Sequence, residues 1–122
     1  MTSPDSAFPQ IDYGYFYLNL GDWNKALVYF RQAIKIDPSQ RGSYYQIARI
    51  LRQHGELEAA IDFYLSAIRI SPDFVPALME LADTYLEMGR TADACEYYGF
   101  VIGLAPSNSS ARSQYRSRGC GK

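Results

Sequence analysis

Residues that build catalytic and metal sites are scarce in this sequence. Its 122 residues include one histidine, His54, and two cysteines, Cys95 and Cys120. His54 has no second histidine and no paired cysteine near it, so we interpret it as a solvated turn residue. The two cysteines are too few for a disulfide framework and lack the spacing of metal ligands. We therefore expect a protein that is not an enzyme and that holds no metal and no cofactor.

A strong net charge and a long apolar run are also missing. Lys and Arg total 12 against 13 for Asp and Glu, which leaves a net charge of -1. This balance creates no field that would attract nucleic acid or an anionic membrane. Nowhere do about 18 apolar residues follow one another, and the first residues show no basic run before an apolar stretch. We expect a cytoplasmic protein with no membrane partner and a disordered leader over residues 1–6.

The chain is long enough for one domain, and its 48% hydrophobic content can fill a continuous core. Proline, glycine and alanine each recur in it at intervals of 34 residues. The recurring residues are Pro38, Pro72 and Pro106, then Gly21, Gly55 and Gly89, then Ala26, Ala60 and Ala94. This period predicts three structural units, at 7–40, 41–74 and 75–108.

Each unit contains two stretches of helical periodicity separated by its glycine. We predict first helices at 9–20, 42–54 and 76–88, and second helices at 23–36, 57–70 and 91–104. The glycine tolerates the left-handed conformation that commonly follows a helix. The proline ends the second helix, because it lacks an amide hydrogen and disfavours helix at the residue before it. Three helical hairpins follow from this pattern.

The recurring pattern resembles the tetratricopeptide repeat, whose signature joins a Leu-Gly pair, a Tyr, an Ala, an aromatic, a second small residue and a Pro. The first unit matches it with Tyr13-Gly14, Tyr17, Ala26, Phe30, Ala33 and Pro38. The second matches with Ile47-Ala48, Leu51, Ala60, Tyr64, Ala67 and Pro72, and the third with Leu81-Ala82, Tyr85, Ala94, Tyr98, Val101 and Pro106. The leading Trp of the signature is replaced by Gln10, Tyr44 and Leu78. The resemblance implies an all-α solenoid with its repeats stacked in a right-handed superhelix.

Residues 109–122 follow the last repeat. Ala111 and Tyr115 are spaced four apart, which favours a short capping helix with a basic flexible tail after it. We interpret Cys95, at the position of Leu27 and Ile61 in the other repeats, as a small core residue. Cys120 lies between glycines in the tail, so we expect an exposed thiol there.

The resemblance also implies a function, because the first helices of such repeats line a concave groove in which a partner peptide lies. The corresponding residues are Phe8, Ile11, Asp12, Tyr15, Leu18 and Asn19 in the first repeat, Tyr45, Gln46, Arg49, Arg52 and Gln53 in the second, and Met79, Glu80, Asp83, Leu86 and Glu87 in the third. We expect a protein or peptide partner and no small-molecule substrate. The groove would change from apolar to basic to acidic, which suits a partner that is apolar, then acidic, then basic. Two alternatives stay open: Ile11 and Leu18 pack against the leader, or Arg49 and Arg52 pair with Glu80 or Asp83 across repeats.

A subset of the family grips the carboxylate end of heat-shock chaperones with Lys, Asn and Arg side chains. The matching positions here hold Ile11, Tyr15, Gln46, Pro76 and Glu80, so we do not expect that ligand. A second hypothesis is a structural homo-oligomer that pairs through outer or end surfaces, to which Phe100, Val28 and Leu65 would contribute. Nucleic-acid binding would rest on the basic tail alone, and we interpret that tail as solubilising.

Overall fold

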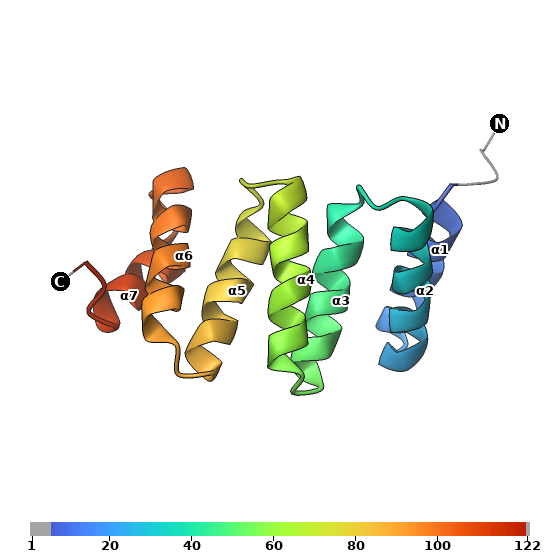
Figure 1. The fold of residues 1–122 in the computed structure, drawn as a ribbon, viewed down its shortest axis with the longest axis horizontal. Coiled ribbons are helices and arrows are strands. Elements are labelled where there is room, and N and C mark those ends of the chain that lie inside the picture. The colour runs from blue at the N-terminus through green and yellow to red at the C-terminus, as the bar shows by residue number, and fades with distance from the viewer. Residues whose placement is uncertain (1–5, 122) are drawn as a thin grey trace.

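The computed structural model describes residues 6–121, and these form seven α-helices and no strand. The helices are α1 (Phe8–Asn19), α2 (Trp23–Ile36), α3 (Arg41–Gln53), α4 (Leu57–Ile70), α5 (Val75–Glu87), α6 (Thr91–Leu104) and α7 (Ser109–Ser117). Consecutive helices pack against one another, so the chain forms a row with α1 at one end and α7 at the other (Figure 1). The structure is thus the predicted all-α solenoid, closed by a short capping helix.

The helix bounds follow the spacing of glycine and proline. The second helices have their predicted bounds, and each first helix starts and ends one residue earlier than predicted. Gly21, Gly55 and Gly89 adopt φ values of 80°, 80° and 75°, which places each of them in the left-handed region. The backbone amide three residues after each first helix donates to a carbonyl in the last turn of that helix; Glu56 N, for example, lies 2.9 Å from Leu51 O. Glycine therefore closes each hairpin in the way that the sequence predicts.

The core consists of residues that recur between repeats. Ala26, Ala60 and Ala94 are fully buried, as are the aromatic side chains four residues later. Those aromatic residues are Phe30, Tyr64 and Tyr98. Small residues let the two helices of a hairpin approach closely, and the large rings fill the space beside them.

The C-terminal segment differs from the sequence prediction in one respect. Cys95 on α6 forms a disulfide with Cys120, with the two Cα atoms 5.4 Å apart. Cys120 is therefore not the exposed thiol that we expected, and Cys95 is not only a core residue. Gly119, with φ of 72°, turns the chain back after α7 and brings Cys120 to α6. The repeat pattern could not predict this pairing, because it depends on the path of a segment beyond the last repeat. The predicted leader lies outside the described residues except for Ser6.

Candidate functional site

The first helices of the three repeats, α1, α3 and α5, carry the predicted groove residues. Side chains from α3 and α5 converge on a hollow of about 480 Å³. Six residues line this hollow, all of them among the predicted groove positions: Arg49, Arg52, Gln53, Glu80, Asp83 and Glu87. Helical spacing explains the convergence, because residues three, four and seven apart share one side of a helix.

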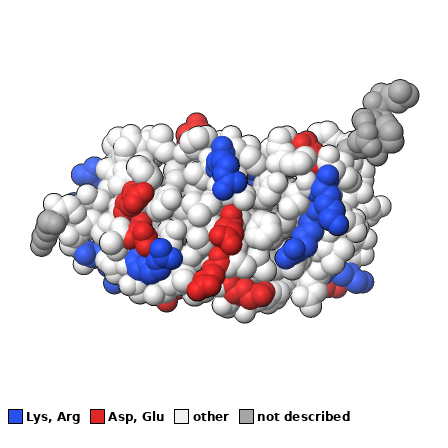
Figure 2. Space-filling view, viewed as in Figure 1, with Lys and Arg blue, Asp and Glu red and all other residues white. Residues whose placement is uncertain are grey.

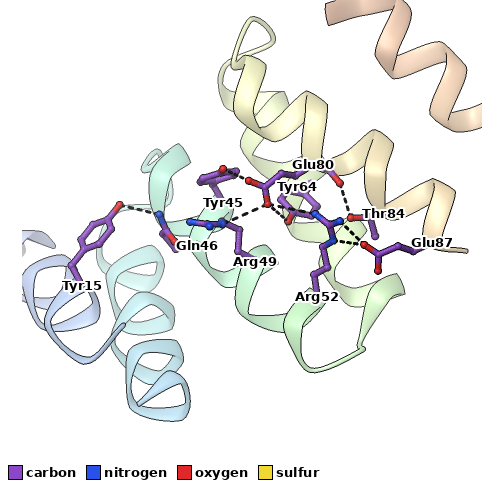
Figure 3. Close-up of polar contacts among 9 residues, drawn as sticks. All are labelled: Tyr15, Tyr45, Gln46, Arg49, Arg52, Tyr64, Glu80, Thr84 and Glu87. Atoms are coloured by element: carbon purple, nitrogen blue, oxygen red, sulfur yellow. Dashed lines mark hydrogen bonds and ion pairs between the residues drawn. The ribbon is translucent and has the colours of Figure 1, made fainter. Parts of the chain in front are cut away.

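The arginines on α3 pair with carboxylates on α5 across the repeat boundary (Figure 3). Arg49 Nε lies 3.5 Å from Glu80 Oε1, and Arg52 Nη1 lies 3.8 Å from the same oxygen. Arg52 also pairs with Glu87, to which its Nε donates at 2.7 Å. The ion pairing between repeats, which the sequence left open, is therefore present. Glu80 is a partner as expected, Glu87 takes the place of Asp83, and neither arginine pairs with Asp83. Half of the Arg49 side chain stays exposed, whereas three quarters of the Arg52 side chain is buried.

Glu80 is the centre of this polar network. Tyr45 Oη donates to Glu80 Oε2, and Tyr64 Oη donates to Glu80 Oε1 at 2.9 Å. Burial raises the pKa of both tyrosines, and the charge and hydrogen bond of Glu80 raise it further. Both hydroxyls therefore stay protonated and act as hydrogen-bond donors to Glu80.

Tyr98, at the same position in the third repeat, also donates to a carboxylate. Its hydroxyl donates to Asp83, and burial together with that carboxylate raises the pKa of Tyr98. Sequence reasoning missed Tyr64 and Tyr98 as groove residues, because they belong to second helices and match the buried aromatic of the signature. The available signal was the hydroxyl itself, since a buried tyrosine oxygen needs a hydrogen-bond partner.

The predicted groove residues on α1 are mostly apolar. Phe8 is 64% exposed and Tyr15 is also exposed, whereas Ile11 and Leu18 are partly buried. The Tyr15 ring packs edge-on against Phe30, with the centroids 5.2 Å apart. Gln46 Nε2 donates to Tyr15 Oη at 3.4 Å and so links α3 to α1 (Figure 3).

The remaining predicted groove residues lie at its edges or within the core. Asp12 and Asn19 on α1 are exposed. Met79 and Leu86 on α5 are half-buried and pack against the hydrophobic core, as does Leu18. These three side chains contribute mainly to packing and offer a guest little surface.

The described residues were also compared with the requirements of a metal site and of a membrane span. Within residues 6–121, no group of three or more His, Cys, Asp or Glu side chains is arranged to hold a metal ion. The helices described here include none with the length and apolarity needed to cross a membrane. Acidic and basic side chains are interspersed over the face shown in Figure 2.

Comparison with known proteins places this geometry in a family. Two models of the tetratricopeptide repeat match the chain, one over residues 14–73 and the other over residues 51–98. The human protein O-mannosyl-transferase TMTC3 is 27% identical over 85 residues, which is 70% of this chain and 9% of TMTC3. The chain therefore spans less than a tenth of that relative.

Solved structures share the fold at low sequence identity. The crystal structure of MamA superposes with a TM-score of 0.87 at 23% identity, covering 95% of this chain and 68% of that one. The first tetratricopeptide domain of Spaghetti (RPAP3), bound to the HSP90 peptide SRMEEVD, superposes with a TM-score of 0.84 at 16% identity, covering 97% and 96%. Four observations agree on the family: the 34-residue period, the glycine turns, the buried alanine and aromatic positions, and the two family matches. This chain belongs to the tetratricopeptide repeat family.

Proposed function

We propose that the chain is a protein-interaction scaffold that holds an extended segment of a partner protein along the groove of α1, α3 and α5. The observation that carries this proposal is the hollow of about 480 Å³, where six polar side chains from two repeats converge. Exposed aromatic side chains of α1, Phe8 and Tyr15, continue the same surface. A groove with an apolar end and polar groups at its centre has the composition of a peptide site.

The charges of the hollow indicate the chemistry of the guest. Two arginines face three carboxylates, so the lining carries a net charge of -1. Because Arg52 is held by Glu87 and Glu80, the basic middle section expected from the sequence is largely neutralised. We therefore revise the guest: apolar side chains would lie against Phe8 and Tyr15, and a lysine or arginine would lie near Asp83 and Glu87. Of the two arginines, Arg49 has the more exposed side chain and is the one that could meet an acidic group.

This chemistry argues against an acidic guest like the one held by the Spaghetti (RPAP3) domain. That peptide, SRMEEVD, contains two glutamates and a terminal aspartate. The clamp positions here hold Ile11, Tyr15, Gln46, Pro76 and Glu80. The three carboxylates of the hollow outnumber its two arginines, so an acidic peptide would meet a net negative lining, and charges that oppose a ligand are an effective source of specificity.

Peptides selected from a random displayed library against the full chain would test the proposal. We expect the selected sequences to carry apolar residues followed by a lysine or arginine, and to bind one to one in titration calorimetry. Tyr15→Ala should weaken them roughly tenfold, because truncating an aromatic anchor at an interface commonly costs more than 1 kcal/mol. The peptide SRMEEVD should bind no better than its scrambled sequence.

Phe100→Ala is the matched control, because Phe100 is an aromatic residue that is 51% exposed on a second helix, outside the groove. It should leave the affinity unchanged, and circular dichroism should show equal helicity for both variants. If Phe100→Ala weakens the selected peptides and Tyr15→Ala does not, the guest lies on the other face and the groove assignment is wrong.

A further inference from the structure

A separate hollow of about 350 Å³ lies where α7 packs on α6, at the far end of the row from α1 (Figure 1). Five residues line it, and none of them belongs to the groove: Ile102, Arg112, Tyr115, Arg116 and Cys120. We call this site the cap hollow. Gly99 on α6 lets the two helices approach, since a Cβ atom there would lie only 3.6 Å from the Tyr115 ring. The volume is within the range of small-molecule sites, roughly 300–1,000 Å³.

The lining of the cap hollow is basic, because it holds two arginines and no acidic residue. Arg112 and Arg116 are one turn apart on α7, so they share a side of the helix. Both are exposed, and within residues 6–121 neither of them forms an ion pair with a carboxylate. Guanidinium groups in this state can bind the carboxylates of a small molecule, often through two parallel hydrogen bonds. The groove hollow has a net negative lining and would not attract the same molecule.

Cys120 brings a reactive bond to the cap hollow. Its disulfide with Cys95 joins residues that are 25 apart in the sequence, and both cysteines are only partly buried. Cys120 lines the hollow, whereas Cys95 is not among the lining residues. A molecule in the hollow therefore meets the sulfur of Cys120. Disulfides that solvent can reach are the ones that exchange readily with thiols.

We propose that the cap hollow is a thiol-exchange site whose substrate is a small thiol that carries carboxylates. Glutathione, the main thiol of reducing compartments, has this chemistry. Arg112 and Arg116 bind the carboxylates, and the side chains of Ile102 and Tyr115 contact the rest of the molecule. This places the thiolate beside Cys120. The site shares no residue with the groove hollow, so the inference is independent of the proposed peptide binding.

The exchange takes place in two balanced steps. The incoming thiolate attacks Sγ of Cys120, and a mixed disulfide forms as the bond between Cys95 and Cys120 breaks. Cys95 leaves as a thiolate and takes a proton from water. A second thiolate then attacks the sulfur of the bound small molecule and releases Cys120, which is protonated in turn. The two cysteines gain two electrons, and two molecules of the small thiol are oxidised to their disulfide.

The exchange gives the end of the row two covalent states. Gly119 and Gly121 flank Cys120 and adopt φ values of 72° and 82°. Because glycine is free to take other conformations, the segment around Cys120 can leave α6 once the bond is broken. The ratio of small thiol to its disulfide in the surroundings therefore sets whether Cys120 is tied to α6.

Exchange rates of the oxidised full chain with two thiols test the proposal. Glutathione carries carboxylates and 2-mercaptoethanol carries none, so the ratio of their rate constants measures the preference for an acidic thiol. Acid quenching followed by mass spectrometry measures each rate constant. In Arg112→Gln/Arg116→Gln the ratio should fall roughly fivefold, within the range for the loss of two exposed ion pairs. The rate with 2-mercaptoethanol should change little, because the disulfide itself is unaltered.

Lys35→Gln/Arg69→Gln is the matched control. It removes the same charge from exposed positions on α2 and α4, and it should leave the ratio unchanged. All four side chains are exposed, so both double variants should fold, as circular dichroism would verify.

Two measurements on the wild-type chain need no variant. Raising the salt concentration from about 20 to about 500 mM should lower the ratio, because salt screens exposed charges. Alkylation after the quench, followed by peptide mapping, should find the first glutathione adduct on Cys120 and the alkyl group on Cys95. An unchanged ratio in the arginine variant or at high salt, a first adduct on Cys95, or a bond that resists millimolar glutathione would each overturn the proposal.

Discussion

At the scale of single residues, Gly14 shows how closely the helices of the first repeat approach. A Cβ atom at this position would lie 2.8 Å from Cε1 and Cζ of Phe30, a fully buried ring. We predict that Gly14→Ala lowers the free energy of unfolding by roughly 1–3 kcal/mol through overpacking, even though alanine favours the helix. Gly103→Ala is the matched control on α6, where an added Cβ meets nothing within 4 Å. It should raise stability by roughly 0.5–1 kcal/mol. Urea unfolding measures the free energy of unfolding of both variants. Equal changes of the same sign would contradict the packing argument.

The same scale shows what the sequence could and could not predict. Gly21, Ala60 and Pro72 recur with the 34-residue period, so their turns, contacts and helix ends were predictable from spacing alone. The pairing of Arg52 with Glu87 depends on side-chain reach across a repeat boundary, and periodicity contains no such information. Tyr64 was predicted as a core ring, but its hydroxyl also reaches Glu80 in the groove. The sequence therefore indicated the six residues that line the hollow, whereas the ion pairs among them required coordinates.

At the scale of elements, α7 depends on the disulfide more than the other helices do. It has nine residues, and isolated helices of that length are marginal in water. The bond between Cys95 and Cys120 closes a separation of 25 residues. By loop-closure entropy, reduction or Cys120→Ser should lower the free energy of unfolding by about 3 kcal/mol. Hydrogen exchange with and without reductant should show loss of protection in α7, while the amides of α3 remain protected.

A Cys95→Ser/Cys120→Ser double variant provides the control for this element. It should match the reduced wild-type chain in hydrogen exchange, since neither contains the bond. Ala111, which is fully buried, and the Asn108 cap, whose Oδ1 accepts from Ala111 N at 2.9 Å, would still favour α7. If α7 is protected equally in oxidised and reduced protein, these contacts suffice and the disulfide does not hold the cap.

At the scale of the whole molecule, the buried tyrosines make stability depend on alkaline pH. Tyr45, Tyr64 and Tyr98 have their pKa raised above the ordinary value of 10.0, in each case chiefly by burial and then by a neighbouring carboxylate. The folded chain therefore holds these protons more tightly than the unfolded chain. Their contribution to stability is complete below pH 10 and is lost as the pH rises above it. Each tyrosine can add at most about 1.4 kcal/mol per pH unit to that loss.

Tyr64→Phe separates this titration from general alkaline damage. The variant loses the hydrogen bond to Glu80, so its free energy of unfolding at neutral pH should fall by roughly 1.5–3 kcal/mol, the range for bonds to charged groups. Between about pH 10 and 11.5, the free energy of unfolding of the variant should decline less steeply than that of the wild-type chain, because one fewer group releases a proton on unfolding. Urea unfolding at several pH values measures both quantities. Since Glu80 also joins α3 to α5, parallel curves for the two proteins would mean that the Tyr64 proton is not coupled to the stacking of the repeats.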